Sequence, residues 1–187
     1  MERRDPNFRL ATGLANRFGL RQENDKGVSA QVLRIAPVSQ ADEMEVVRGL
    51  FLEYAASLEI DIGYQGFAAE VAGLPGAYAP PDGSLLLAKA DSSPAGCVGI
   101  RRLHDEVCEM KRLYVRSSHR GSGIGARLVE TAIESALALG YQEMWLDTLT
   151  SMVDAHRLYR RLGFREIAPY GSVHAPGSRF YGLHLVG

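Results

Sequence analysis

The glycine-rich stretch HRGSGIGARL at residues 119–128 constrains the fold more than any other part of the chain. Strand-like residues at 106–115 precede it, and an apolar helical pattern follows it without a break. The first turn of a helix has N–H groups without intrahelical partners and carries partial positive charge. Gly121, Gly123 and Gly125 have no Cβ, so an oxygen-rich ligand can approach this backbone closely. The stretch therefore predicts a strand–loop–helix unit with an anion site that suits a pyrophosphate.

The loop alone is open to more than one interpretation. It can be a glycine turn that only permits tight packing. It also satisfies the dinucleotide pattern G-x-G-x-x-G/A through Gly121, Gly123 and Ala126, with Asp147 ending a later strand. The order of elements disfavours that second interpretation. An antiparallel meander precedes the loop, and too little chain follows it to complete a doubly wound sheet.

The rest of the chain predicts one α/β domain over residues 31–187, preceded by a loosely ordered extension at 1–30. A strand that ends at Pro37 leads to a helix whose start at Ser39 has Asp42 three residues later, which is a capping pattern. Residues 60–83 are rich in Gly, Pro and aromatics, and predict a surface segment around a short helix. The other expected strands are 84–90, 96–103, 106–115 and 142–149, with two closing strands after 163. Two more helices are expected, one directly after the glycine-rich loop and one at 151–163.

Composition excludes several classes of protein. The 187 residues carry 21 basic and 22 acidic side chains, a net charge of −1, so no broad basic field favours nucleic acid. Cys97 and Cys108 lie in apolar runs, and neither CxxC nor HExxH occurs, so we expect no metal site. No signal peptide or membrane span is recognisable, which favours a cytoplasmic protein with no membrane partner.

Two motifs together resemble the GNAT superfamily of N-acetyltransferases. Arg120, Gly123 and Gly125 match the acyl-CoA signature R/Q-x-x-G-x-G/A. The later stretch AHRLYRRLGF at 155–164 resembles the family's A-x-x-L-Y-x-x-x-G-F element. The resemblance covers residues 31–187. It departs from many family members at Met152, where an Asn is usual, so the polar contact of that Asn with the coenzyme is not expected here.

The resemblance implies an acyl-CoA N-acyltransferase fold: a mixed, mostly antiparallel sheet of about six to seven strands flanked by helices. It implies acetyl-CoA as cosubstrate, without a metal, and it allows a homodimer. The pantetheine arm is expected to bond the backbone of the strand before the loop, and the pyrophosphate to rest on the loop itself, where Arg116 adds charge. The implied coenzyme contacts are Leu113, Val115, Arg120, Gly121, Ser122, Gly123, Ile124, Gly125 and Ala126.

The resemblance also implies catalytic residues. Tyr159 matches the family's general-acid tyrosine, with a core aromatic as the alternative. Glu109 is the candidate general base, with a salt-bridged strand residue as its alternative, and Glu106 and Asp147 are further candidates. By strand parity Glu109 faces the same side as Leu113 and Val115, opposite to Cys108 and Met110.

We expect acetyl transfer from acetyl-CoA to a primary amine by direct attack in a ternary complex, with a small molecule or a protein amine as acceptor. A non-catalytic acyl-CoA-binding or sensing module and a transferase for longer acyl chains are the alternatives. Specificity is expected in the two segments that the motifs leave unassigned, 60–82 and 169–180. Their candidate residues are Asp61, Tyr64, Phe67, Glu70, Tyr78, Tyr170, His174 and Arg179.

Overall fold

The structure is a computed structural model of the chain, and it describes residues 32–58, 60–63, 66–171 and 174–185. The predicted extension at 1–30 and the candidate residue Tyr64 lie outside these residues. Among the described residues, the strands are β1 (Leu33–Pro37), β2 (Ser84–Ala90), β3 (Ser93–His104), β4 (Val107–Val115), β5 (Glu143–Leu149), β6 (Arg165–Glu166) and β7 (Ser178–His184). The helices are α2 (Ala41–Ala56), α3 (Phe67–Ala72), α4 (Ile124–Ala138) and α5 (Val153–Arg161), with short 3-10 turns η3 (Gly76–Tyr78) and η4 (Ser117–His119).

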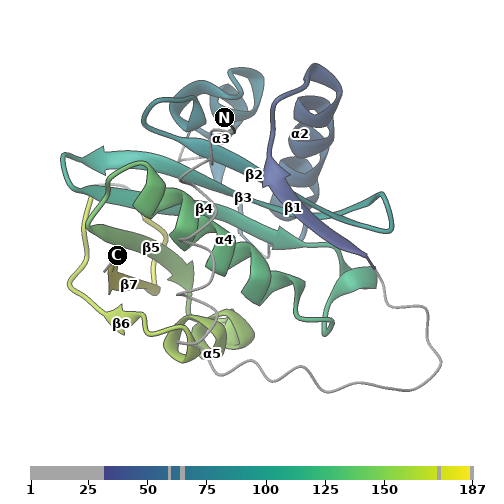
Figure 1. The fold of residues 1–187 in the computed structure, drawn as a ribbon. Helices are drawn as coiled ribbons and strands as arrows, with labels where there is room; N and C mark the ends of the chain where they lie inside the picture. Colours follow the sequence, from purple (N-terminus) through teal and green to yellow (C-terminus); the bar gives the residue numbers. More distant parts are fainter. Residues whose placement is uncertain (1–31, 59, 64–65, 172–173, 186–187) are drawn as a thin grey trace, which may run out of the picture. The chain divides into compact units, whose positions relative to one another are not determined.

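One mixed sheet contains all seven strands in the order β1-β2-β3-β4-β5-β7-β6. Every neighbouring pair is antiparallel except β4 and β5, which run parallel and are connected through α4. Figure 1 shows α2 and α3 on one face of this sheet and α4 and α5 on the other. The predicted fold class is therefore confirmed.

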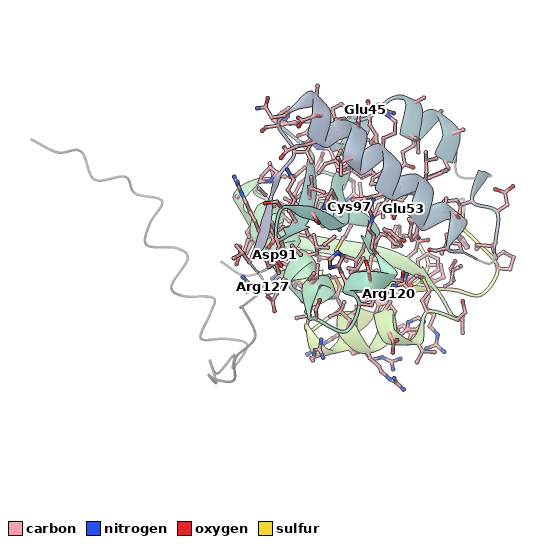
Figure 2. All side chains as sticks on the ribbon, turned by 90° about the vertical axis from the view of Figure 1, so that its right-hand side faces the viewer. Glu45, Glu53, Asp91, Cys97, Arg120 and Arg127 are labelled. Atoms are coloured by element: carbon pink, nitrogen blue, oxygen red, sulfur yellow. The ribbon has the colours of Figure 1, made fainter. Side chains whose placement is uncertain are left out.

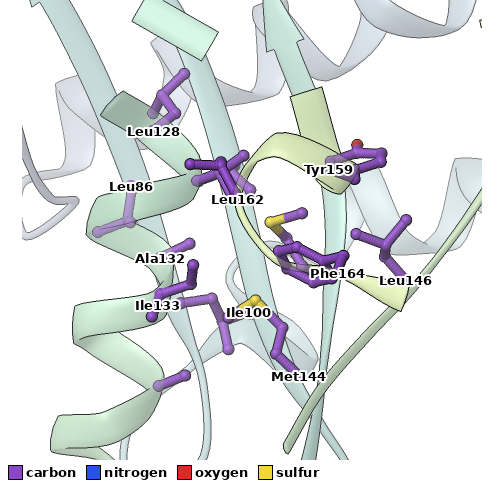
Figure 3. Close-up of a cluster of buried hydrophobic side chains, with 14 of the residues drawn as sticks. Leu86, Ile100, Leu128, Ala132, Ile133, Met144, Leu146, Tyr159, Leu162 and Phe164 are labelled. Atoms are coloured by element: carbon purple, nitrogen blue, oxygen red, sulfur yellow. The ribbon is translucent and has the colours of Figure 1, made fainter. Parts of the chain in front are cut away.

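Each face of the sheet has its own apolar core. The α4 face contains the larger core, in which Leu128 and Ala132 of α4 pack on the sheet together with Tyr159 of α5 and Leu162, the residue that follows α5 (Figure 3). The α2 face contains a smaller core from α2, the segment that follows it, and the strands β2 and β3. Phe67 and Tyr78 are buried in this second core, so the segment at 60–83 is anchored by its aromatic residues.

A β-bulge at Arg112 changes which way the second half of β4 faces. Lys111 pairs with Gly99 and Tyr114 pairs with Cys97, so β4 has one residue more than β3 across this interval. Arg112 takes up the extra residue with a φ of +58°. The parity prediction for β4 is wrong for this reason. Leu113 and Val115 pack in the α4-side core, the same core that contains Cys108 and Met110, and Glu109 faces the other side.

Two smaller predictions are also wrong. Gln40, not Ser39, is the N-cap residue of α2, and it makes no side-chain capping hydrogen bond. The backbone N–H of Ser39 instead donates to the carboxylate of Glu43 at 3.3 Å, so an acidic residue in the first turn takes the reciprocal role expected for Asp42.

Candidate active site

The candidate active site is a cleft that opens where β4 and β5 separate. The two strands pair only as far as Glu109 and Trp145, and beyond this point the described residues provide no strand between them. The cleft is open to solvent, and its empty volume of about 590 Å³ includes part of that solvent. Its lining residues are Tyr54, Leu58, Ile60, Ile62, Met110, Lys111, Arg112, Leu113, Asp147, Thr148, Leu149, Met152, Tyr159 and Ser178.

The glycine-rich loop connects the end of β4 to the start of α4. Gly121 and Gly123 have φ values of +79° and +83°, which explains why glycine occurs at both positions. Gly123 is the N-cap residue of α4 and has no side chain to cap the helix. Within the described residues no hydrogen bond occupies the backbone N–H groups of residues 121–126. The loop therefore presents a row of free donors at the positive end of a 15-residue helix.

The two arginines near the loop differ in their availability. Arg116 is paired with Glu53 through two contacts, Nε to Oε2 at 2.9 Å and Nη2 to Oε1 at 2.6 Å, and it also donates to the carbonyl of Pro94. Its expected contribution to a phosphate site is therefore largely neutralised by Glu53. Arg120 is exposed beside the start of α4 (Figure 2), and its Nε donates to the carbonyl of Val115 at 3.0 Å.

Tyr159 extends from α5 to the cleft. Its ring packs against Phe164, with ring centroids 5.7 Å apart, and its hydroxyl oxygen points away from Phe164 (Figure 3). The side chain is 6% exposed and lines the cleft. Burial raises the pKa of Tyr159 well above its ordinary value, and the nearby Tyr54 and Asp147 add to the shift. A tyrosine in this setting keeps its proton at neutral pH and can donate it to a developing anion.

Glu109 lies on the α2 face at the point where β4 and β5 separate. Its Oε2 accepts from Arg101 Nε at 2.8 Å, and its Oε1 accepts from the hydroxyl of Tyr170 at 3.0 Å. Lys111 Nζ lies 3.5 Å from the same Oε1. The side chain is 4% exposed and does not line the cleft. The geometry thus matches the salt-bridged alternative for Glu109 more closely than a group in contact with substrate.

Asp147 and Lys111 form an ion pair inside the cleft. Lys111 Nζ lies 2.6 Å from Asp147 Oδ1, and their side chains are 11% and 15% exposed. The sequence indicated Asp147 only as a further base candidate, and Lys111 only as a possible salt-bridge partner of Glu109, without a role in the site. The available signal was a lysine on a strand whose other residues are mostly apolar.

None of the described candidate residues in the predicted acceptor segments lines the cleft. Glu70 binds Arg112 through two contacts, at 2.6 and 3.0 Å, and also accepts from the hydroxyl of Tyr78. Burial alone would raise the pKa of Glu70, but Arg112 outweighs it and lowers that pKa. Asp61 is exposed and caps the N–H of Gly63. The residues of these segments that do line the cleft are Ile60, Ile62 and Ser178.

Comparison with known proteins identifies the family and the fold. The family model of the acetyltransferase (GNAT) family matches residues 53–164. An uncharacterised N-acetyltransferase of Schizosaccharomyces pombe is 36% identical over 140 residues, which cover 74% of this chain and 86% of that protein. A GNAT-family acetyltransferase from Staphylococcus aureus superposes with a TM-score of 0.69 at 21% identity, covering 83% of this chain and 100% of that one. An acetyltransferase from Salmonella typhimurium solved with acetyl-CoA has a TM-score of 0.61 at 18% identity, over 82% and 94% of the two chains.

The fold and the cleft define an acyl-CoA N-acyltransferase. The chain belongs to the acetyltransferase (GNAT) family, and it is an acetyl-CoA-dependent N-acetyltransferase. None of the described helices is long and apolar enough to cross a membrane.

Proposed function

We propose that this enzyme acetylates the primary amine of a small acceptor by direct attack on acetyl-CoA in a ternary complex. The observation that carries the proposal is the cleft between β4 and β5, which is lined by the buried Tyr159, together with the free N–H groups of residues 121–126 in the loop that follows β4. The pyrophosphate of the coenzyme is assigned to that row of N–H groups. Its pantetheine arm is assigned to the unpaired edge of β4 around Leu113 and Val115.

The coenzyme contacts are mainly contacts with the main chain. The backbone N–H groups of residues 121–126, including those of Ser122, Ile124 and Gly125, face the phosphates in this proposal, whereas the N–H of Arg120 donates to the carbonyl of Ser117. Arg120 is an exposed cation in this loop, and it can exchange its bond to the Val115 carbonyl for a phosphate oxygen. The absence of Asn at position 152 removes a side-chain contact, and Met152 instead gives the cleft an apolar wall.

The chemistry needs a proton acceptor and a proton donor. The neutral amine nitrogen attacks the thioester carbonyl carbon, the carbon–sulfur bond breaks, and the products are an amide and coenzyme A with a free thiol. The nitrogen gives up a proton as the new bond forms, and Asp147 is the carboxylate within the cleft that can accept it. The leaving sulfur takes a proton from Tyr159. Glu109 then acts indirectly, by holding Lys111 beside Asp147.

A covalent acetyl-cysteine intermediate is disfavoured. Cys97 and Cys108 are both buried, and neither lines the cleft. Burial raises the pKa of the Cys108 thiol to about 12 and that of Cys97 further, so neither forms a thiolate at neutral pH.

Release of coenzyme A thiol over a panel of amines tests the proposal. We expect thiol release that depends on both acetyl-CoA and an amine, with one acetylated product for each coenzyme A released. Initial rates should vary as in a sequential mechanism, with intersecting double-reciprocal lines. Binding of acetyl-CoA without turnover of any amine would favour the sensing module, and faster turnover of longer acyl-CoA thioesters would favour the other alternative.

A further inference from the structure

We propose that the acceptor is an α-amino acid with an apolar side chain, held by its own two charges. The inference rests on the proposed amine acetylation and specifies the substrate class for the same cleft. Three independent features support it: the Lys111–Asp147 ion pair, the hydroxyl of Ser178, and the apolar wall from α2 and the segment after it.

The ion pair matches the two charges of an amino acid. Lys111 and Asp147 place a cation and an anion side by side, with Nζ and Oδ1 2.6 Å apart. An α-amino acid likewise carries its ammonium and its carboxylate close together, on the same carbon atom. It can lie antiparallel to the protein pair, with its ammonium on Asp147 and its carboxylate on Lys111. A simple amine would pair with Asp147 alone, whereas an amino acid would also place its carboxylate on Lys111.

Ser178 supplies a hydrogen-bonding group that no described residue uses. Its Oγ is buried and has no hydrogen-bond partner among the described residues, although buried hydroxyls normally have one. Ser178 pairs with Leu149 and Phe180 pairs with Asp147 across β5 and β7, so Ser178 and Asp147 project from the same face of the sheet. A carboxylate oxygen of the acceptor is a suitable partner for this hydroxyl.

The same face has apolar walls. Tyr54 and Leu58 from the α2 end, together with Ile60 and Ile62, line the cleft opposite the sheet. Arg112 is the other cation in the lining, and it is committed to Glu70 through two contacts at 2.6 and 3.0 Å. A second carboxylate in the acceptor would therefore lack a cation of its own, so leucine, methionine or phenylalanine fits better than aspartate.

Matched acceptor pairs test the substrate class in the thiol-release assay. Leucine is compared with isoamylamine, and phenylalanine with phenethylamine, because each pair differs only in the carboxylate. We expect kcat/KM for the amino acid to exceed that for its amine by at least about tenfold, as for the loss of one charged hydrogen bond. Leucine should also exceed aspartate. Equal or faster turnover of the amines would overturn the amino-acid assignment while amine acetylation stands. If no acceptor is turned over, amine acetylation itself fails, and the two failures are thus distinguishable.

Substitutions at Ser178 and Lys111 test whether these residues bind the carboxylate of the acceptor. Ser178→Ala should raise KM for leucine several-fold while leaving KM for isoamylamine unchanged. Lys111→Gln should lower the ratio of kcat/KM for leucine to that for isoamylamine. Lys111→Arg keeps the positive charge and should retain this ratio, so the test does not depend on the folding of the glutamine variant alone. Lys89→Gln is the matched control, because Lys89 also forms an ion pair, 2.9 Å from Glu43, but lies outside the cleft. An equal effect of Ser178→Ala on leucine and isoamylamine would contradict the assignment of the hydroxyl to the carboxylate.

Discussion

At the residue scale, Tyr159 is the side chain on which the proposed chemistry depends most. Changing Tyr159→Phe removes the proton donor and keeps the ring that packs against Phe164. We expect kcat to fall by roughly a hundredfold or more, the size of a general-acid contribution, with little change in the Kd of acetyl-CoA. Steady-state thiol release and isothermal titration measure the two quantities.

Tyr181→Phe is the control for that experiment. Tyr181, like Tyr159, is buried in the core on the α4 face of the sheet. Its hydroxyl forms a hydrogen bond with His156 Nδ1 at 3.0 Å, and the residue does not line the cleft. Its removal should cost about 1 kcal/mol of stability and leave kcat nearly unchanged. A similar loss of kcat in both variants would indicate a structural role for Tyr159.

The sequence predicts single residues well where a motif fixes their position, and poorly where the backbone departs from regular geometry. The loop glycines connect a strand to a helix and Tyr159 lies within a helix, as the sequence pattern predicts for these elements. The face of the sheet on which Leu113 and Val115 lie was predicted wrongly. Strand parity assumes that side chains alternate without a break, and the bulge at Arg112 adds a residue. The sequence contains no local signal for this bulge, because arginine is uncommon at positive φ.

At the scale of elements, the loop before α4 depends on backbone conformations that glycine adopts freely. Changing Gly123→Ala places a Cβ on a residue with φ of +83°. The strain should lower the free energy of unfolding by about 1–2 kcal/mol and weaken acetyl-CoA binding, because the loop donors shift. Thermal denaturation and titration of acetyl-CoA measure both effects.

Gly49→Ala makes the matched comparison within α2. A Cβ at Gly49 meets no atom within 4 Å, and the position is interior to the helix. We expect this substitution to raise the free energy of unfolding by about 0.5–1 kcal/mol, with no effect on coenzyme binding. Stabilisation by both alanines would argue against a conformational requirement at Gly123.

The buried pair of Arg112 and Glu70 connects β4 to α3. Changing Glu70→Gln leaves the guanidinium of Arg112, 4% exposed in its side chain, without its carboxylate. We expect a loss of about 3–5 kcal/mol, measured by urea denaturation. Glu53→Gln breaks the more exposed pair with Arg116, with side chains 39% and 34% exposed, and should cost less than about 1 kcal/mol. Equal losses of unfolding free energy in the two variants would show that burial does not determine how much each ion pair contributes to stability.

At the scale of the whole molecule, stability should fall in acid. The pKa values of Glu43, Glu53 and Glu70 are lowered from 4.5 by their basic and hydrogen-bonding partners. Each carboxylate therefore contributes stability that is fully present above its unfolded pKa and is lost as the pH falls through its lower folded pKa. The urea concentration at the midpoint of unfolding should therefore fall as the pH is lowered below 4.5. Changing Glu70→Gln should make this fall smaller without abolishing it.

The seven-strand architecture follows from alternation and turn residues, but the cleft does not. Its lining depends on where β4 and β5 stop pairing, and on contacts such as that of Lys111 with Asp147, which are 36 residues apart. Ser178 carries no local signal at all, because a serine in a strand is unremarkable until its hydroxyl is found without a partner. These features arise from tertiary packing and were therefore beyond sequence analysis.

The most direct test of the account is amide chemical-shift mapping of acetyl-CoA binding by NMR. If the coenzyme lies along the open edge of β4 with its pyrophosphate on the loop, the largest shifts will fall on residues 113–115 and 121–126, with smaller shifts near Tyr159. Shifts of comparable size elsewhere and none in the loop would contradict the assignment of these free N–H groups to the coenzyme.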